Sequence, residues 1–313
     1  MRRRPSEPAM MVWQAEKCVM LGAYQVAYAE VDMDYARQAG IQIVRRSSGG
    51  GAIFTDMGTF LYTMIQPYRS EAPVRDIARE TIAGAVVGAL NEMGVPAVLE
   101  GRNDILVDGK KISGIAQQVR HGCLCTHGSL LYDTDLEMLA DVLRVDDEKI
   151  RSKAIRSVRG RVTNIKEYVG LSTRDFGDRL KRNLMAGTGA TEYVLTDDEL
   201  NEIENIYREK YGNAAWTFGN SPAFSFHNSR RFPGGKVEVY LDIVGGTVAS
   251  CAVRGDFLGT AAIRELEEKL ENTVFEYDAL RGVLEGLMLH PYLGSVTKDE
   301  LLACIFERKA EEK

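Results

Sequence analysis

The sequence lacks a long apolar segment. Its longest apolar stretches, such as Ala83 to Leu90, are far shorter than the roughly 18 to 20 residues that cross a bilayer. The basic start, Met-Arg-Arg-Arg-Pro-Ser-Glu-Pro, is not followed by the apolar core of roughly 7 to 15 residues that a secretory signal needs. We therefore exclude an integral membrane protein and expect a cytoplasmic protein with no membrane partner.

Cysteine is scarce as well. The 313 residues contain five cysteines, an odd number in a chain too large to need disulfide bonds, so we expect reduced thiols. Repeats and low-complexity tracts are absent, and the 45% hydrophobic and 27% charged residues are typical of a folded globular protein. The net charge of −6 argues against a nucleic-acid partner.

The first part of the chain combines strands with one clear helix. The run from Val74 to Met93 places apolar residues at helical spacing and stops before Gly94 and Pro96, which predicts a helix. Asp108-Gly109 predicts a tight turn between two strands. Periodicity and β-branched residues predict strands at 10–13, 17–21, 41–45, around Val98, and at 104–107, 111–118 and 129–132.

Helical patterns dominate from residue 136 to residue 211, and strands return after Gly212. We expect helices at 133–143, 146–154, 173–186 and 196–211, the last with the capping box Thr196, Glu199. A hairpin of 236–242 and 248–254 about Gly245-Gly246 follows, and then helices at 260–270 and 278–289. The prediction is an α+β fold with a mixed β-sheet and packed helices, divided into a large domain at 1–212 and a smaller α+β domain at 213–313.

Three consecutive glycines follow one predicted strand, in the segment Arg-Arg-Ser-Ser-Gly-Gly-Gly-Ala-Ile-Phe from Arg45 to Phe54. Glycines let the backbone approach a ligand and point N–H groups at an anion, and arginine binds phosphate or carboxylate. The glycine spacing fits neither a P-loop nor a dinucleotide fingerprint. The segment is a candidate phosphate site, and the alternative is a glycine-rich hairpin with two solvated arginines.

A second candidate is the stretch from Gly101 to Gly114. If Asp108-Gly109 makes a hairpin turn, Asp104 and Lys111 lie on adjacent strands. The carboxylate can hold Mg²⁺, and the ammonium can neutralise a phosphate or a reacting carboxyl group. The alternative is an ordinary solvated lysine beside a turn.

The segment His121-Gly-Cys-Leu-Cys-Thr-His127 resembles a metal site, because potential ligands recur at every second residue. Alternate residues of a strand are roughly 6.5 to 7 Å apart, so they cannot converge on one ion unless the strand turns. A nucleophilic Cys123 or Cys125 with a histidine base is another possibility. Ordinary packed side chains remain the favoured interpretation.

A basic stretch extends from Lys149 to Arg182, with eleven Lys or Arg and three acidic residues. Such a stretch is usually a solvated face, but it can also hold a nucleotide or attract an acidic protein. Within it, Ser157 to Asn164 is expected to be a loop that presents arginines.

The order of these motifs resembles the lipoate-protein ligase family. The motifs are Arg-Arg-x-x-Gly-Gly-Gly-Ala (45–52), Gly-Arg-Asn-Asp (101–104), Lys-Lys-Ile-Ser-Gly-x-Ala (110–116), His-Gly-Ser-Leu-Leu (127–131) and Ser-Val-Arg-x-Arg-Val-Thr-Asn (157–164). The segment from Trp216 to Ser225 and the hairpin after Gly234-Gly235 resemble the small accessory domain of this family. The resemblance covers nearly the whole chain and implies a biotin/lipoate ligase-like fold.

The resemblance implies an ATP-dependent ligase. Such an enzyme activates lipoate to lipoyl-adenylate and transfers the lipoyl group to a lysine of a 2-oxoacid dehydrogenase E2 lipoyl domain or of the glycine-cleavage H protein. Lys111 is the implied catalytic residue, and Asp104, with Asn103, the implied Mg²⁺ ligand. The implied ATP- and lipoate-binding residues are Arg46, Gly49, Gly50, Gly51, Ala52, Ile53, Phe54, Asn103, Asp104, Lys111, Ser113, Gly114, His127, Arg159 and Arg161.

The sequence departs from the family pattern in three places. The family normally begins with a strand and a helix bearing Asn-Leu-Ala-x-Glu-Glu, and we expect this chain to lack them, because no such motif precedes Met11. Thr55 and Thr59 stand where the family usually has His and Asn, and Ala23-Tyr24 replaces a more polar pair. Two alternatives therefore stay open: an ATP-independent octanoyl or lipoyl transferase with a cysteine nucleophile, and a non-catalytic relative that binds lipoate or lipoyl domains.

Overall fold

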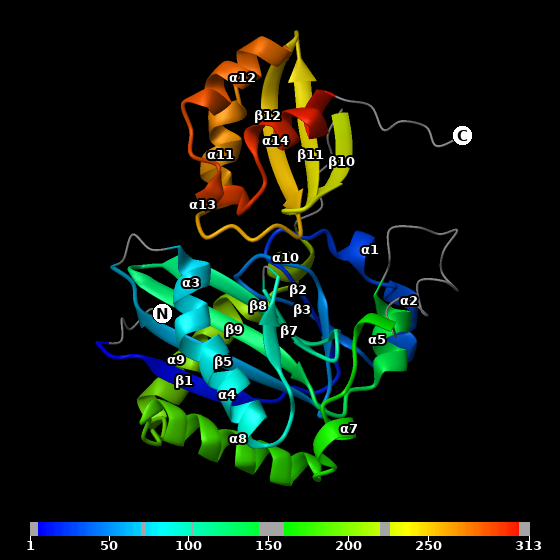
Figure 1. Cartoon of the computed structure of the whole chain (residues 1–313). Coiled ribbons are helices and arrows are strands. Elements are labelled where there is room, and N and C mark those ends of the chain that lie inside the picture. Colours follow the sequence, from blue (N-terminus) through cyan, green and yellow to red (C-terminus); the bar gives the residue numbers. More distant parts are fainter. Residues whose placement is uncertain (1–5, 70–72, 102, 144–159, 220–225, 307–313) are drawn as a thin grey trace. The chain divides into compact units, whose positions relative to one another are not determined.

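The computed structural model describes residues 6–69, 73–101, 103–143, 160–219 and 226–306. The chain forms two compact units, shown in Figure 1. The first unit consists of Met1–Met20, Glu30–Val44 and Ile53–Asn213. The second consists of Ala214–Lys313 together with two segments from the N-terminal part of the chain, Leu21–Ala29 and Arg45–Ala52. The triple glycine therefore lies in the second unit.

A six-stranded antiparallel sheet forms the centre of the first unit, in the order β1-β5-β9-β8-β7-β6. Its strands are β1 Ala9–Trp13, β5 Thr59–Pro67, β6 Val98–Glu100, β7 Asp104–Val107, β8 Lys110–Arg120 and β9 Cys123–Leu131. The strands predicted in these regions are confirmed, and β5 had not been predicted. A smaller sheet has the order β3-β2-β4, with β2 Cys18–Leu21, β3 Gln42–Arg45 and β4 Ile53–Thr55. The two short helices α1 Ala27–Glu30 and α2 Met33–Gln38 connect β2 to β3.

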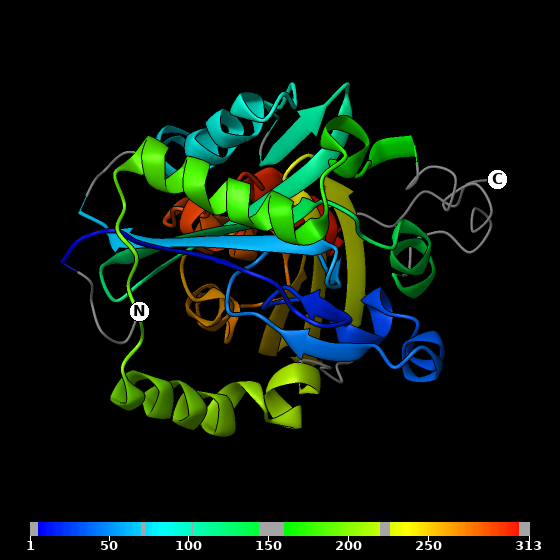
Figure 2. The ribbon, with the colours of Figure 1, turned by 90° about the horizontal axis from the view of Figure 1, so that it is seen from below.

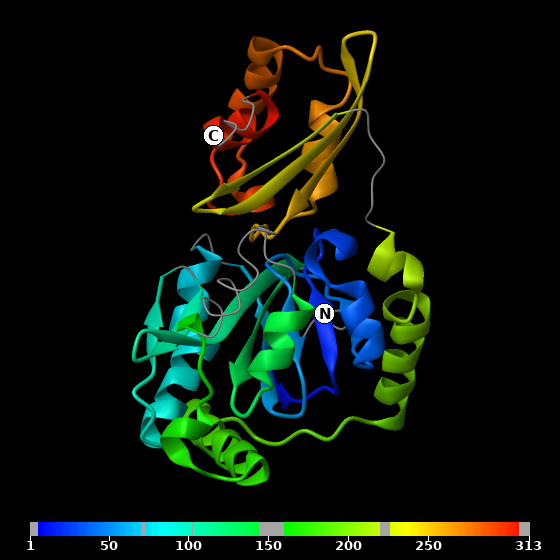
Figure 3. The ribbon, with the colours of Figure 1, turned by 90° about the vertical axis from the view of Figure 1, so that its right-hand side faces the viewer.

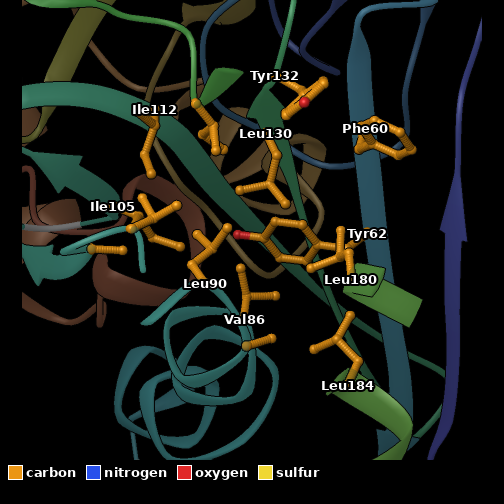
Figure 4. Close-up of a cluster of buried hydrophobic side chains, with 14 of the residues drawn as sticks. Phe60, Tyr62, Val86, Leu90, Ile105, Ile112, Leu130, Tyr132, Leu180 and Leu184 are labelled. Carbon is orange, nitrogen blue, oxygen red and sulfur yellow. The ribbon is translucent and has the colours of Figure 1, made fainter. Parts of the chain in front are cut away.

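Two helices, α4 Gly84–Glu92 and α8 Thr173–Thr188, pack on one face of the large sheet (Figure 2). The hydrophobic core lies between them and the sheet. It includes Tyr62, Leu90, Ile105, Leu130 and Leu180, all of them fully buried. Figure 4 shows that these side chains converge.

The helix predicted from Val74 to Met93 is confirmed, but it is not regular. It consists of α3 Val74–Ala78, the π-helical segment η1 Arg79–Ala83, and α4. Within η1, Thr81 has φ −112° and ψ −114°, outside the helical region. A Cβ on Gly84 would lie 2.6 Å from the carbonyl oxygen of Arg79, so this wide turn requires glycine at its end.

The remaining helices of the first unit lie at its surface. They are α5 Leu136–Val142, α7 Lys166–Val169 and α9 Asp197–Ile206, and α9 continues into η3 Tyr207–Tyr211 as one rod (Figure 3). The capping box of Thr196 and Glu199 at the start of α9 is confirmed. The helix predicted at 146–154 lies outside the described residues.

The second unit contains an antiparallel sheet in the order β10-β11-β12, formed by β10 Phe226–Phe232, β11 Gly235–Val244 and β12 Thr247–Gly255. The predicted hairpin about Gly245-Gly246 is confirmed. Helices α11 Ile263–Leu270 and α12 Tyr277–Glu285 were predicted, whereas β10, α10 Ala214–Phe218, α13 His290–Leu293 and α14 Lys298–Phe306 were not. Among the helices formed by the described residues, none is long and apolar enough to cross a membrane.

Candidate active site

The hairpin of β7 and β8 carries the charged pair predicted from the sequence. Asp108 and Gly109 form its turn with φ values of 48° and 73°, the left-handed geometry that the Asp-Gly pair favours in two-residue hairpins. The Nζ atom of Lys111 lies 2.7 Å from Oδ1 of Asp104. The prediction that these two side chains lie on adjacent strands is confirmed. Their side chains are 38% and 35% exposed, so both remain accessible to a ligand.

A β-bulge puts Lys111 and Asp104 on the same face of the sheet. Asp104 is opposite Gly114 and Ile105 is opposite Ser113, but Leu106 is opposite Lys111, so Ile112 is an extra residue in β8. Successive strand residues normally alternate between faces, and an extra residue reverses this alternation locally. Without it, Lys111 and Gly114, three residues apart, would have pointed to opposite faces.

Gly114 provides the space into which the lysine folds. A Cβ on Gly114 would lie 3.2 Å from both Cε and Nζ of Lys111. The lysine side chain therefore passes over the glycine on its way to Asp104. A larger residue at this position would push the ammonium away from the carboxylate.

Asp104 has the chemistry of a magnesium ligand, and the neighbouring Asn103 is bonded to the backbone of Ile115. The Oδ1 atom of Asp104 is buried and makes its ion pair but no hydrogen bond. Asn103 donates its side-chain N–H to the backbone carbonyl of Ile115 at 2.9 Å, and the backbone carbonyl of Asn103 accepts from the amide of Ile115 at 2.8 Å. Mg²⁺ is commonly held by one or two carboxylates together with substrate phosphates. A single carboxylate at Asp104 fits that arrangement.

The end of the arginine-rich motif lies directly beside Lys111. Val162 forms a parallel bridge with Lys111, and the amide of Thr163 donates to the Lys111 carbonyl at 3.2 Å. The next residue, Asn164, exchanges two hydrogen bonds with the backbone of Thr134, at 3.0 and 2.9 Å. These contacts hold the motif against β8. Arg161 is exposed nearby, and Arg159 lies outside the described residues.

Two other candidates from the sequence have different surroundings. His127 is partly exposed and lies opposite Ala116 on β8. Because Ala116 is two residues from Gly114, His127 belongs to the same sheet face as Lys111. Ser113 points the other way: it is 1% exposed, and its Oγ lies 3.0 Å from the Tyr62 hydroxyl oxygen in the core. A direct contact between the Ser113 side chain and a ligand is therefore not supported by its orientation.

The cysteines of β9 are poorly suited to nucleophilic chemistry. Cys123 is 1% exposed. Burial raises the pKa of the Cys125 thiol to about 11, so only a very small fraction is thiolate near neutral pH. Within the described part of the chain, no cluster of three or more His, Cys, Asp or Glu side chains could hold a metal ion. The metal interpretation of the segment from His121 to His127 is thus not supported.

In the second unit, the triple glycine folds around the side chain of Arg46. The guanidinium Nη2 donates to the carbonyls of Gly49 and Gly51, each at 2.8 Å. Gly50 has φ 94°, and its amide donates to the carbonyl of Phe257 at 3.1 Å. A Cβ on Gly49 would lie 2.6 Å from that same carbonyl oxygen. The close approach of the Phe257 backbone is therefore sufficient reason for glycine at position 49.

Arg45 is buried and holds segments of the backbone together. It is 2% exposed, and burial, followed by the positive charge of Arg254, lowers its pKa to about 10. Among the described residues, its guanidinium donates only to backbone carbonyls, those of Gly22, Ala23, Gln25, Trp216 and Thr217. The alternative of a hairpin with two solvated arginines is therefore wrong, and β3 and β4 are not neighbours in their sheet.

The residues after the glycines run from one unit into the other. Ala52 is the last residue of its segment in the second unit, whereas Ile53 and Phe54 begin β4 in the first. Phe54 is 1% exposed and lies opposite Val19. The candidate residues thus form two groups, one around Lys111 in the first unit and one around Arg46 in the second.

Comparison with known proteins identifies the same family for both parts of the chain. Residues 1–185 match the lipoyl protein ligase A/B catalytic domain, and residues 221–305 match the bacterial lipoate protein ligase C-terminus. The lipoate-protein ligase LplJ of Bacillus subtilis is 34% identical over 307 residues, which cover 96% of this chain and 92% of that protein.

Solved structures agree. One is a bipartite lipoate protein ligase of Thermoplasma acidophilum, described with its E2 lipoyl domain, with 30% identity, a TM-score of 0.64, and coverage of 71% of this chain and 88% of that one. Another is a lipoate-protein ligase A bound with ATP, with 29% identity, a TM-score of 0.60, and coverage of 68% and 86%. The chain therefore belongs to the lipoate-protein ligase family.

Proposed function

We propose that this protein activates lipoate with ATP and transfers the lipoyl group to a lysine of an acceptor protein. The observation that carries the proposal is the pair of Lys111 and Asp104, brought to one sheet face by a β-bulge, in a chain of this family. A relative in the same family has been solved with ATP bound.

In the first step, a carboxylate oxygen of lipoate attacks the α-phosphorus of ATP, and pyrophosphate leaves. Both reacting groups are anionic, so a cation is needed between them. The Lys111 ammonium is the group we assign to this role, because it can stabilise the negative charge that develops as the acyl-phosphate bond forms. Asp104 would hold Mg²⁺, which supplies further charge neutralisation when bound.

In the second step, an acceptor lysine amine attacks the carbonyl carbon of lipoyl-adenylate, and AMP leaves. We propose a lipoyl domain of a 2-oxoacid dehydrogenase E2 or the glycine-cleavage H protein as acceptor. One relative has been studied together with an E2 lipoyl domain.

We assign ATP and lipoate binding to two groups. The first is Lys111, Asp104, Asn103, Gly114, His127 and Arg161, with Ser113 acting through the backbone and Arg159 assigned from its motif alone. The second is Arg46 and the segment from Gly49 to Phe54. When ATP binds, Arg46 would exchange its carbonyl partners for phosphate oxygens.

We further propose that residues 1–212 form the catalytic domain and residues 213–313 the accessory domain. The cytoplasmic location stays a prediction from the sequence.

The test is lipoate-dependent pyrophosphate release by Lys111→Ala, with Lys110→Ala as the matched control. Lys110 is the exposed neighbour of Lys111 and makes no ion pair in the described structure. We expect at least a hundredfold loss in Lys111→Ala and less than a twofold change in Lys110→Ala, with both variants folded. Near wild-type release by Lys111→Ala would refute the assignment. Binding of lipoate or a lipoyl domain without ATP turnover in the wild type would favour the non-catalytic alternative.

A further inference from the structure

Tyr62 occupies the middle of the core directly behind the candidate site. It lies on β5, is 0% exposed, and extends its hydroxyl group into the cluster formed by Leu90, Ile105 and Leu130 (Figure 4). Among the residues that the structure describes, the Tyr62 hydroxyl group forms a hydrogen bond only with Oγ of Ser113, at 3.0 Å. Burial raises the pKa of the Tyr62 phenol, so this hydroxyl keeps its proton and can donate.

The phenol crosses a whole strand to reach Ser113. Tyr62 is opposite Gly128 on β9, and Gly128 is opposite Ile115 on β8. A Cβ on Gly128 would lie 2.3 Å from the Tyr62 hydroxyl oxygen. Only glycine leaves room for the ring, so the glycine of the His-Gly-Ser-Leu-Leu motif and the serine of the Lys-Lys-Ile-Ser-Gly motif serve one contact.

Ser113 is part of the bulge that orients Lys111. Ile112 and Ser113 are consecutive, yet they are 0% and 1% exposed, so both side chains point to the core. Apolar packing explains this orientation for Ile112. For Ser113, a buried hydroxyl needs a hydrogen-bond partner, and Tyr62 provides it.

We propose that Tyr62 is a positioning residue for Lys111: its hydrogen bond to Ser113 fixes the β-bulge at Ile112 and thereby directs the lysine over Gly114 to Asp104. The catalytic meaning of this arrangement rests on the proposed function, but the arrangement itself can be tested without turnover. Loss of the hydroxyl would let the strand recover regular alternation, which turns Lys111 away from Asp104.

A labelling experiment tests the orientation of Lys111. The full-length protein is treated with limiting N-hydroxysuccinimide acetate, and mass spectrometry gives the acetylation rate of Lys111 relative to Lys110. The ion pair protects Lys111 in the wild type, so we expect the ratio to rise at least threefold in Tyr62→Phe and in Ser113→Ala. Asp104→Asn sets the upper limit. Tyr132→Phe is the matched control, because it removes another buried hydroxyl of the same core, one bonded to the carbonyl of Leu171.

The outcomes separate positioning from general stability. An unchanged ratio in both Tyr62→Phe and Ser113→Ala, or an equal rise in Tyr132→Phe, would overturn the proposal. No rise in Asp104→Asn would also overturn it, because then no ion pair orients the lysine in solution.

Pyrophosphate release gives the kinetic counterpart. We expect kcat to fall about tenfold in Tyr62→Phe, with the KM for ATP within about twofold and with no such loss in Tyr132→Phe. If the wild type releases no pyrophosphate, the proposed function fails, while the labelling ratio still decides the positioning role. If the labelling ratio rises but kcat is unchanged, Lys111 is positioned by Tyr62 without being catalytic.

Discussion

Replacing Arg45 by lysine should loosen the second unit around the triple glycine. The guanidinium of Arg45 binds carbonyls on two sides: Gly22, Ala23 and Gln25 on one, and Trp216 and Thr217 on the other. A lysine ammonium is a single point with three donors and cannot reach both sides. The substitution therefore leaves at least two carbonyls without a donor.

The magnitude follows from these contacts. A carbonyl left buried without a partner costs about 1 to 3 kcal/mol, so two of them give roughly 2 to 6 kcal/mol for opening this region. Since about 1.4 kcal/mol corresponds to a factor of ten, amides that depend on Arg45 should exchange at least about 30-fold faster.

Hydrogen exchange followed by mass spectrometry is the assay. The reporters are the Ala23 amide, bonded to the Ser48 carbonyl at 2.9 Å, and the Arg46 amide, bonded to the Leu21 carbonyl at 3.0 Å. Arg281→Lys is the control, because Arg281 lies in the same unit, is exposed, and bonds to the Glu285 carboxylate at 3.0 Å, away from the triple glycine. Unchanged protection of these amides in Arg45→Lys, or the same change in both variants, would refute the reasoning.

Three further outcomes are expected. Cys123→Ala and Cys125→Ala should retain pyrophosphate release within about twofold, and a large loss in either would revive the cysteine-nucleophile alternative. Charge reversal at Arg174 and Lys181 should slow acceptor lipoylation several-fold at low salt but leave adenylation unchanged; equal effects on both rates would exclude a docking role. Burial favours the neutral form of Glu271. Hydrogen bonds from the Arg264 guanidinium and from the Cys251 amide nevertheless hold the pKa of Glu271 below its usual value. The ionised Glu271 carboxylate therefore stabilises the folded protein above about pH 4.5, and this stabilisation is lost as the pH falls. Between about pH 5 and 3, the urea midpoint of Glu271→Gln should thus fall less than that of the wild type.

Local signals in the sequence predicted many of the elements. Gly94 and Pro96 end a helix at any position in a fold, and Asp108-Gly109 favours a tight turn whatever lies beyond it. The resulting hairpin was sufficient to place Asp104 beside Lys111. The family resemblance then linked motifs that are individually weak.

Long-range contacts explain what the sequence did not predict. The bulge at Ile112 depends on Tyr62, which is 50 residues away in the sequence. The alternation of apolar and polar residues in β8 does not reveal that one residue of the strand is extra. The Lys-Lys-Ile-Ser-Gly motif predicts that Ser113 binds a ligand, but the Ser113 side chain lies in the core and bonds to Tyr62. Likewise, Arg45 and Arg46 are adjacent in the sequence, yet one is 2% exposed and bonded to distant carbonyls, and the other folds over the glycines.

The most direct test of the central claim is a pyrophosphate-release assay on the 313-residue chain with ATP and Mg²⁺, comparing lipoate, octanoate, biotin and no acid. Acyl adenylation predicts release that requires lipoate or octanoate and is absent with biotin or without an acid. Release that does not depend on the acid, or no release with any of them, would contradict it.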